Sequence, residues 1–326
     1  MTLRMPAEWA RHERVWIGFP SHEIEWPGVI DQARAEVAAF ANAVHAQGAG
    51  ETVHLIAADD ISAAAARVLA APGVIVETYR FGDIWLRDTG PIVVGTGAVR
   101  EARDFGFNGW GGKYDMPGDS DIGARLAEAM GIPARRCDWV FEGGALDLDG
   151  TGLAVTTEQC LLNPNRNPDL SREQIAARLF NELGVDCILW LGDGLLNDHT
   201  DGHVDNLARF VGANRLAVPA PEGEDDPNAA IYADVRTRAA AMDIEVVLLP
   251  SPGLIRRDGE IVPASYMNFY IGNAVVVVPL YGASNDDAAI EAIQDLFPTR
   301  RVVGLRADHI LVGGGSFHCI SQQVPA

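Results

Sequence analysis

One order of elements recurs along this chain and constrains its fold more than any other feature. A turn rich in Gly or Asn is followed by an apolar strand, a polar loop, a helix and a second strand. Such turns recur about every 60 residues, and they end at Gly97, Gly152, Asn214 and Asn273. A period of this length that contains both strand and helix favours radial or solenoid repetition. Ordinary α/β proteins also alternate strands and helices, so the period alone does not decide the architecture.

The unit after Gly152 is the clearest. It predicts strands over 153–157 and 187–191, separated by a helix that begins after Ser171. Ser171 and Gln174 have the spacing of a capping box. Four apolar residues also fall at the spacing of an amphipathic helix. They are Ile175, Leu179, Phe180 and Leu183. The helices of the other units are expected over 29–46, 121–130, 231–242 and 286–296.

The two ends of the chain complete the pattern. The strand over 14–19 has no predecessor, and the segment over 317–323 has no successor. Pairing these two would close a ring of five units and remove an exposed sheet edge. The repeats therefore predict an α/β ring built from the whole chain, residues 1–326.

The chain is strongly acidic. It has 25 Lys and Arg against 45 Asp and Glu, which gives a formal net charge of −20. Such a charge repels phosphate backbones and anionic lipid head groups, so nucleic acid and membrane surfaces are not expected as partners. It attracts a cationic partner instead. Solubility alone is an equally good explanation of the charge.

The cysteines and the apolar runs point to a reducing compartment. No apolar run approaches the roughly 20 residues that span a bilayer, and residues 1–14 lack the apolar core of a signal peptide. The four cysteines are widely spaced without a metal-type CxxC pattern. We therefore expect reduced thiols in a cytoplasmic protein. Cys137, Cys160 and Cys187 follow or lie in apolar stretches and are expected in the core.

Five segments that lead from one repeat into the next carry polar or reactive side chains near the start of a strand. They cover residues 85–91, 141–144, 198–206, 265–269 and 313–319. Glycines in four of them allow close backbone approach at a crowded axis. We therefore expect six side chains to converge: Asp88, Glu142, His203, Asp205, Asn268 and Cys319.

These side chains have a defined chemistry. A cysteine thiolate is a strong nucleophile, and an imidazole can protonate a leaving group and then activate water. His203 and Asp205 share one face if their segment is extended, because strand side chains alternate. Carboxylates without a basic partner attract a cation, and a planar guanidinium offers each of them paired N–H donors. The pattern predicts a guanidinium site with the Cys319 thiol at its central carbon.

Two residues of these segments, Asp88 and His318, can also be explained without a role in binding or catalysis. Asp88 can form a local ion pair with Arg87, or cap the end of a strand. His318 precedes Cys319 in the sequence. Because adjacent strand residues face opposite sides, we expect a structural role for His318.

A metal site is an alternative for the segment around His203. His199 and His203 have the spacing of a helical metal pair, so a metallohydrolase could use Asp198, His199, His203 and Asp205. Asp201-Gly202 lies between the two histidines and makes a helix there unfavourable. We therefore expect no metal.

A series of short motifs runs in order along nearly the whole chain. They are Met5-Pro-Ala-Glu-Trp9, Trp85-x-Arg-Asp-x-Gly-Pro91, Phe107-Asn-Gly-Trp-Gly-Gly112, Glu142-Gly-Gly144, Leu161-Leu-Asn163 with Arg166-Asn-Pro168, Thr200-Asp-Gly-His-Val-Asp-Asn206, Ala264-Ser-Tyr-x-Asn-Phe-Tyr270 and Gly313-Gly-Gly-x-x-His-Cys-Ile-x-Gln-Gln323. Together they resemble the agmatine deiminase family, the Porphyromonas-type peptidylarginine-deiminase-like branch of the guanidino-group-modifying enzymes.

The resemblance implies a fold and an activity. The fold is a five-bladed pseudo-symmetric α/β propeller that forms a single catalytic domain over residues 1–326. The activity is hydrolysis of agmatine to N-carbamoylputrescine and ammonia, without a metal or an organic cofactor. The implied partner is a small cationic guanidine, and the sequence leaves open whether the chain forms a homo-oligomer.

The resemblance also implies roles for the converging residues. Cys319 would be the nucleophile and His203 the acid and base. Asp88 and Asp205 would hold the guanidinium, and Glu142 would orient the histidine or bind the substrate. Pocket-lining residues would be Trp85 and Asn268, with Trp110 as a weaker candidate.

One residue departs from the pattern of the family. Agmatine-specific members have an acidic residue at the position where this chain has His199. A deiminase that acts on free or peptidyl arginine is therefore an alternative. An amidinotransferase and a propeller that binds a guanidinium without chemistry are the others.

Overall fold

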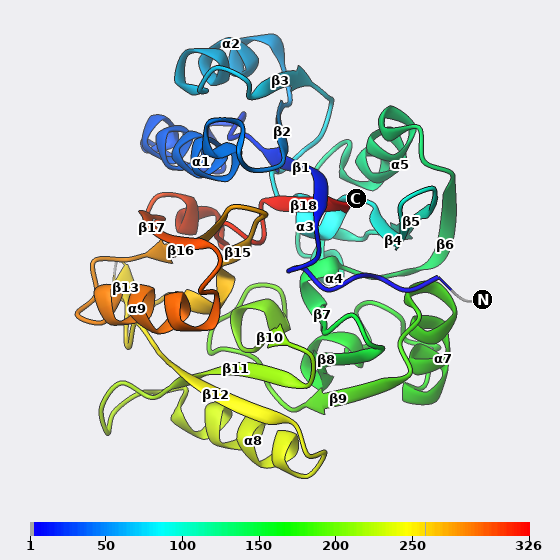
Figure 1. Ribbon diagram of the computed structural model, residues 1–326, viewed down its shortest axis with the longest axis vertical. Helices are drawn as coiled ribbons and strands as arrows, with labels where there is room; N and C mark the ends of the chain where they lie inside the picture. Colours follow the sequence, from blue (N-terminus) through cyan, green and yellow to red (C-terminus); the bar gives the residue numbers. More distant parts are fainter. Residues whose placement is uncertain (1–2, 258) are drawn as a thin grey trace.

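The computed structural model describes residues 3–257 and 259–326 of an α/β protein. Within these residues the strands form five sheets of three or four strands and one two-stranded ribbon. The five sheets are distributed around the middle of the molecule, with most helices at its periphery (Figure 1). None of the helices described is both long and apolar enough to cross a membrane.

Four sheets share one pattern. Their first two strands are antiparallel, and a helix leads from the second strand to a third that runs parallel to the second. The first two of these units are β4 (Ile92–Thr96), β5 (Val99–Gly106), α5 (Asp119–Met130) and β6 (Ala134–Val140), then β7 (Leu146–Leu148), β8 (Leu153–Thr157), α7 (Arg172–Leu183) and β9 (Cys187–Leu191). The other two are β10 (Arg209–Gly212), β11 (Arg215–Ala220), α8 (Ala229–Ala240) and β12 (Glu245–Pro250), then β15 (Tyr270–Ile271), β16 (Val275–Leu280), α9 (Asp286–Leu296) and β17 (Arg301–Arg306).

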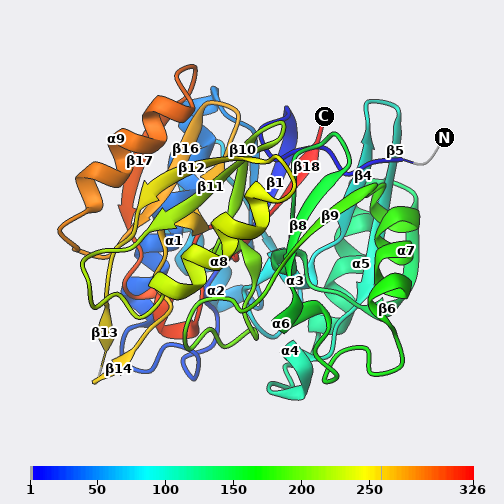
Figure 2. The ribbon, with the colours of Figure 1, turned by 90° about the horizontal axis from the view of Figure 1, so that it is seen from below.

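The fifth sheet joins the two ends of the chain. Its elements are β18 (Ser321–Pro325), β1 (His12–Gly18), α1 (Ile30–His45), β2 (Thr52–Ala57), α2 (Asp60–Leu69) and β3 (Ile75–Thr78). β18 is antiparallel to β1, with Ser321 opposite Ile17, and the two strands lie side by side in Figure 2. The predicted pairing of the opening strand with the last segment is therefore confirmed. α2 and β3, which add a fourth strand, were not predicted.

The helices of the repeats begin and end within two residues of the predicted positions. In α7, Ser171 and Gln174 form the predicted capping box, and Gly184 ends the helix with a left-handed φ of 73°. The prediction that Phe180 belongs to the apolar face is wrong, because its side chain is 45% exposed. Phe180 follows the buried Leu179 and therefore lies about 100° further around the helix.

Short elements complete the chain between the sheets. They are α3 (Leu86–Thr89), α4 (Gly109–Gly112), α6 (Glu158–Leu161), β13 (Arg256–Arg257) and β14 (Glu260–Ile261). The 3₁₀ turns span Ala46–Gly48, Gly143–Ala145, Val204–Asn206, Tyr266–Asn268 and Ile310–Gly313.

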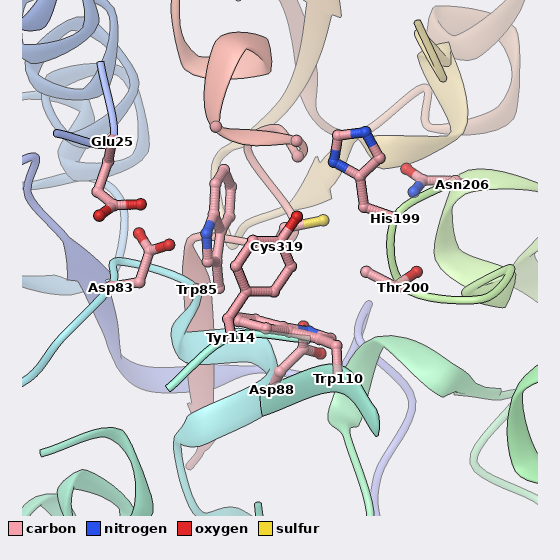
Figure 3. A pocket seen from close by; sticks show the side chains of 13 residues that line it. Glu25, Asp83, Trp85, Asp88, Trp110, Tyr114, His199, Thr200, Asn206 and Cys319 are labelled. Carbon is pink, nitrogen blue, oxygen red and sulfur yellow. The ribbon is translucent and has the colours of Figure 1, made fainter. Parts of the chain in front are cut away.

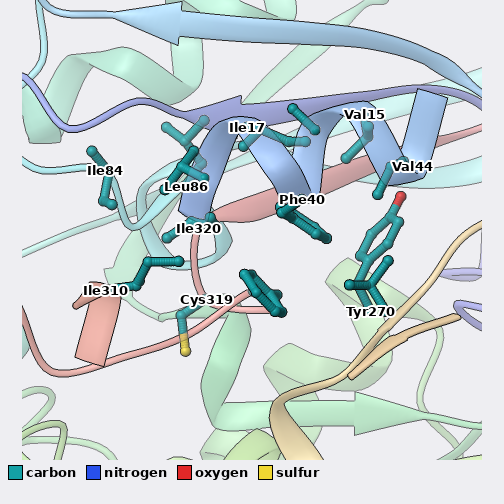
Figure 4. Packing of buried hydrophobic residues seen from close by; sticks show 14 of the residues in the cluster. Val15, Ile17, Phe40, Val44, Ile84, Leu86, Tyr270, Ile310, Cys319 and Ile320 are labelled. Atoms are coloured by element: carbon teal, nitrogen blue, oxygen red, sulfur yellow. The ribbon is translucent and has the colours of Figure 1, made fainter. Parts of the chain in front are cut away.

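The largest apolar cluster fixes the segment that carries Cys319. Phe317 and Ile320 are fully buried on either side of this residue, and the Phe317 ring stacks on Phe40 of α1 with centroids 4.8 Å apart. Figure 4 shows the Cys319 thiol directed away from this cluster. Packing therefore holds the backbone while leaving the sulfur free for polar contacts.

The cysteines differ in their burial. All four are free, and Cys137 and Cys160 are buried as predicted. Cys187, at the start of β9, is exposed, so its expected place in the core is wrong.

Candidate active site

The five segments that connect the repeats end directly before the first strand of each sheet. Their conformation is that of helical turns rather than the expected extended strands: α3 precedes β4, and 3₁₀ turns precede β7, β10 and β15. Cys319 lies in a turn over residues 317–320 before β18. The expectation that His203 and Asp205 share a strand face is therefore wrong. The amides of Leu207 and Ala208 bond back to the Val204 carbonyl, which closes this segment into a turn.

The structure nevertheless brings the six predicted side chains together. The Asn268 amide nitrogen donates to the Cys319 Sγ at 3.0 Å, and Asp205 Oδ2 lies 3.6 Å from the same sulfur. His203 Nδ1 lies 3.8 Å from Asp88 Oδ1, and its Nε2 lies 2.8 Å from Glu142 Oε2. Each of the five connecting segments thus contributes at least one member.

Gly144 marks the point at which three of these side chains meet. Its backbone N–H donates to Asp88 Oδ1 at 2.9 Å. A Cβ on this residue would lie 2.6 Å from His203 Nδ1, 3.0 Å from Asp88 Oδ1 and 3.2 Å from Asp205 Oδ2. Only glycine fits here, since real Cβ atoms do not approach other atoms so closely.

Arg166 anchors Glu142. Its guanidinium donates from Nε to both carboxylate oxygens at 3.0 Å and from Nη2 to Oε2 at 2.8 Å. It also donates to Asp201 Oδ2 and to the Thr200 carbonyl. Its motif was noted in the sequence, but no role was predicted for it. The contact fixes Glu142, which in turn faces the imidazole of His203.

The electrostatics of the site favour a bound cation. Burial, together with the neighbouring carboxylates of Glu142 and Asp205, raises the pKa of Asp88 to about 6. Burial also raises the pKa of Cys319 well above its ordinary value, and the charges of Asp205 and Asp88 add to this shift. For His203 burial opposes the charge, but the Asp88 carboxylate and the hydrogen bond to Glu142 raise its pKa well above the ordinary value.

Two polar atoms at this place have no hydrogen-bond partner among the described residues. They are His203 Nδ1 and Asp205 Oδ1, and both are buried. Buried polar atoms without partners are uncommon in folded proteins. The site therefore has a free acceptor and a free ring nitrogen that a small polar ligand can use.

A pocket leads to this site from the surface. Trp85, Asp88, Trp110 and Cys319 belong to its lining, whereas Asn268, which was predicted to line the pocket, does not. Like Asn268, the side chains of His203, Asp205 and Glu142 are buried and lie outside this lining. In the view of Figure 3, Trp85 lies on one side of the Cys319 sulfur and His199 on the other, and Tyr114 also lines the pocket.

Two acidic residues of the pocket were not predicted. Glu25 and Asp83 line it, and their carboxylates face each other in Figure 3. Burial, with the charge of Glu25, raises the pKa of Asp83 to about 8. Asp83 lies two residues before Trp85, so its position in the sequence was a usable signal. Glu25 had no such signal.

The arrangement of the alternative metal ligands does not match a metal site. Asp198 holds Thr200 and Asn206 through its carboxylate. Within the described ranges, the cluster with metal-like spacing is instead Glu142, Cys160 and His203. The Arg166 guanidinium already occupies the Glu142 carboxylate, so a cation there would be repelled.

The simpler explanations for Asp88 and His318 also differ from the structure. Arg87 does not pair with Asp88, because its guanidinium points to the His318 carbonyl and to Glu8. Asp88 accepts from the Trp110 indole at 2.9 Å instead. His318 lies in a turn, so strand alternation does not apply to it, and its ring contacts Asp205 at 2.8 Å.

Known proteins resemble this chain over its whole length. An agmatine deiminase of Stutzerimonas stutzeri is 37% identical over an alignment of 354 residues, which covers 99% of this chain and 95% of that protein. The structure of Enterococcus faecalis agmatine deiminase is 31% identical with a TM-score of 0.93, covering 99% of this chain and 96% of that one. The agmatine deiminase of C. jejuni with substrate bound is 28% identical with a TM-score of 0.90, covering 100% and 97%. The model of the Porphyromonas-type peptidyl-arginine deiminase family matches residues 4–325, and the chain belongs to this family.

Proposed function

We propose that the chain hydrolyses agmatine to N-carbamoylputrescine and ammonia through a covalent intermediate on Cys319. The observation that carries the proposal is the contact of the Cys319 sulfur, which lines a pocket, with Asp205 Oδ2 at 3.6 Å. His203 lies beside the second carboxylate, Asp88. A nucleophile, an acid–base group and two anionic clamps thus surround one point, as attack on a guanidinium requires.

Binding of the cation prepares the nucleophile. In the empty site, burial and the charges of Asp205 and Asp88 keep the pKa of Cys319 high, so the sulfur holds its proton. A guanidinium between the two carboxylates neutralises their effect, and the thiol then releases its proton to water. The substrate thus generates the thiolate that attacks it.

The chemistry proceeds in two stages. The thiolate forms a bond to the guanidinium carbon, and His203 in its protonated form donates a proton to the departing nitrogen, which leaves as ammonia. The enzyme now carries an amidino group on Cys319 through a thioether bond. Neutral His203 accepts a proton from an attacking water, which forms a tetrahedral adduct on the carbon. Collapse of this adduct breaks the carbon–sulfur bond and forms the carbonyl, and the remaining hydroxyl proton passes to solvent. The products are the N-carbamoyl amine and the thiolate.

Glu142 orients the histidine in this scheme. Its Oε2 accepts from His203 Nε2 at 2.8 Å, which leaves Nδ1 as the nitrogen that exchanges protons with the substrate. Arg166 in turn fixes the carboxylate. Glu142 is therefore proposed to position the base rather than to bind the substrate.

The charges of the pocket favour agmatine over free arginine. Glu25 and Asp83 line it in addition to Asp88, and no Arg or Lys of the described residues belongs to its lining. A substrate with an ammonium tail finds carboxylates there, whereas a free α-carboxylate finds like charge. These two acids are proposed to replace the acidic residue that the family has in place of His199.

The architecture is proposed to be a five-bladed propeller. The repeated strand order of four sheets and the pairing of β18 with β1 support this arrangement, since β18 supplies the first strand that the opening unit lacks. Each blade then contributes one turn to the central site, and the whole chain acts as one catalytic domain.

A panel of substrates tests the proposed function. Ammonia release is measured with agmatine, free arginine and a peptidyl arginine, without any added amine acceptor. We expect agmatine to be the preferred substrate, whereas release only on addition of an amine would indicate an amidinotransferase. Cys319→Ser should bind agmatine and lose more than 99% of turnover, because loss of a nucleophile costs several orders of magnitude. Binding without turnover by the wild type would indicate a non-catalytic guanidinium-binding protein.

A further inference from the structure

His318 joins two buried carboxylates behind the site. Its Nδ1 lies 2.8 Å from Asp205 Oδ2, and its Nε2 lies 2.7 Å from Glu8 Oε2. All three residues are at most 5% exposed. Burial opposes the charge on both carboxylates, but their basic neighbours lower the pKa of each, so both are acceptors. Each ring nitrogen therefore faces a carboxylate oxygen at hydrogen-bond distance, so the imidazole bridges the two acids.

Glu8 lies at the outer end of this arrangement, in the N-terminal motif for which no role was predicted. Its Oε1 accepts from the Ile271 amide at 2.7 Å, and its Oε2 accepts from Arg209 Nη2 at 2.8 Å as well as from His318. Arg209 also donates to the carbonyls of Met267 and Phe269, which flank Asn268. One carboxylate therefore connects His318 with β10 and β15, the strands that follow two other segments of the site.

The arrangement leaves the two oxygens of Asp205 in different states. Oδ2 is fixed by His318, while Oδ1 is buried without a partner in the described part of the chain. A carboxylate held by one oxygen presents the other in a fixed direction to an incoming N–H group. The backbone N–H of His318 also donates to Asn268 Oδ1 at 3.1 Å, so the same residue lies next to the nucleophile and to the amide that contacts it.

We propose that Glu8 and His318 are positioning residues, which hold the Asp205 carboxylate in the orientation that receives the guanidinium. The proposal rests on the proposed function and extends it to a side chain from the N-terminal segment. Glu8 acts through His318 and does not touch the substrate. Loss of the Glu8 carboxylate should therefore lower catalysis more than loss of a comparable buried carboxylate elsewhere in the molecule.

The molecule contains such a pair as a control. His12 Nδ1 lies 3.1 Å from Glu51 Oε1, and both side chains are buried. Glu51 also accepts from the Asn273 amide at 3.0 Å, much as Glu8 accepts from Ile271. No contact of the described residues links this pair directly to Cys319, His203 or Asp205. Glu51→Gln thus removes a buried, histidine-paired carboxylate without disturbing the proposed clamp.

The experiment compares Glu8→Gln and His318→Asn with Glu51→Gln. We measure kcat and KM for agmatine above pH 8, and for butylguanidine, which lacks the ammonium tail, against pH, together with the thermal midpoint of unfolding. Glu8→Gln and His318→Asn should lower kcat/KM about 10- to 100-fold. Below pH 6, where Asp88 already takes up a proton, kcat/KM of both variants should fall more steeply than that of wild type, because Asp205, no longer held by a fixed His318, also takes up a proton in this range. Glu51→Gln should lower the midpoint of unfolding while keeping kcat/KM within about threefold of wild type.

Several charged groups face His318 and Asp205 and must be considered in the profile. They are Arg87, Asp88, Asp147, His203, Arg209 and Cys319. The variants change only the Glu8–His318 side of this set. A steeper fall below pH 6 that appears in both Glu8→Gln and His318→Asn, and not in Glu51→Gln, is therefore assigned to Asp205.

Two further measurements keep the outcomes separate. If His318→Asn does not fold, Glu8→Asp retains the charge for Arg209 but shortens the reach to His318, and it should show an intermediate loss. Agmatine affinity of Cys319→Ser, with and without Glu8→Gln, reports on the clamp without turnover.

Equal losses in the Glu8 and Glu51 variants, or an unchanged pH profile, would overturn the proposal. Absence of ammonia release by the wild type would instead overturn the proposed function.

Discussion

The amide of Asn268 holds the Cys319 sulfur and the backbone beside it at the same time. Its Nδ2 donates to Sγ at 3.0 Å, while its Oδ1 accepts from the backbone N–H groups of His318 and Cys319 at 3.1 and 3.3 Å. The amide thus fixes the direction of the thiol, and its N–H group favours the negative sulfur over the neutral one. Asn268 was expected to converge with Cys319 and to line the pocket, but no contact with the sulfur was predicted for it.

Asn268→Ala should make the sulfur less reactive. Burial and the two nearby carboxylates raise the pKa of Cys319, and the Asn268 hydrogen bond lowers it, so removal of the amide should raise it further. We expect alkylation of Cys319 by iodoacetamide at pH 8 to slow about three- to tenfold. Mass spectrometry of the digested protein measures this rate, and the exposed Cys187 of the same sample serves as internal standard. Unchanged alkylation of Cys319 would contradict a role of the amide in holding the thiolate.

Much of the fold could be predicted because its signals are local. The strand over 153–157, the capping box at Ser171 and the helix over 286–296 all match the structure. A capping side chain and the spacing of apolar residues act within a few residues, so the sequence carries them directly. α2 and β3 were missed, although Asp59 caps α2 by accepting from the Ser62 amide. They fall outside the period, and the repeat pattern offered no position for them.

The site was predicted by residue but not by contact. Cys319, His203 and Asp205 were expected to converge because equivalent positions of repeats meet at one axis. The prediction of an extended conformation around His203 and Asp205 was wrong. The 3₁₀ turn over Val204–Asn206 depends on neighbouring segments rather than on strand alternation. The contact of His318 with Glu8 joins residues 310 positions apart. No periodicity relates two residues at that distance, so only the folded chain reveals the pair.

The ionisation of Asp88 should set the lower end of the active pH range. Burial raises its pKa to about 6, so it becomes protonated below that pH and loses its attraction for the guanidinium. We expect kcat/KM to fall about tenfold for each pH unit below 6. Butylguanidine is the appropriate substrate, because its uncharged tail makes no demand on Asp83. The fall of kcat should begin at a lower pH than that of kcat/KM, since a bound guanidinium stabilises the ionised Asp88 carboxylate. A kcat/KM limb near pH 4 would contradict this assignment.

Asp83→Asn should weaken the recognition of the ammonium tail. Above pH 8, where the Asp83 carboxylate is ionised, removal of a charge-assisted hydrogen bond in a partly buried pocket corresponds to about a tenfold loss of kcat/KM for agmatine. Butylguanidine, which lacks the ammonium group, should be affected less than about threefold. Because the pKa of Asp83 is about 8, kcat/KM of the wild type for agmatine should also fall as the pH drops below 8. The variant should lack this fall. Equal losses for both substrates would indicate that Asp83 supports the pocket without reading the tail.

Gly144→Ala should lower turnover strongly by separating the catalytic groups. Its new methyl group would lie 2.6 Å from His203 Nδ1 and 3.0 Å from Asp88 Oδ1, so the imidazole or the carboxylate must move. A displacement of this kind costs about 100-fold in turnover. Gly212→Ala is the matched control, because the nearest atoms to its methyl group lie 3.6 and 3.8 Å away, on Arg215. Ammonia release and the thermal midpoint of unfolding are measured for both variants. We expect Gly212→Ala to keep wild-type turnover, and substantial turnover in a folded Gly144→Ala would mean that His203 and Asp88 need not lie as close as they do.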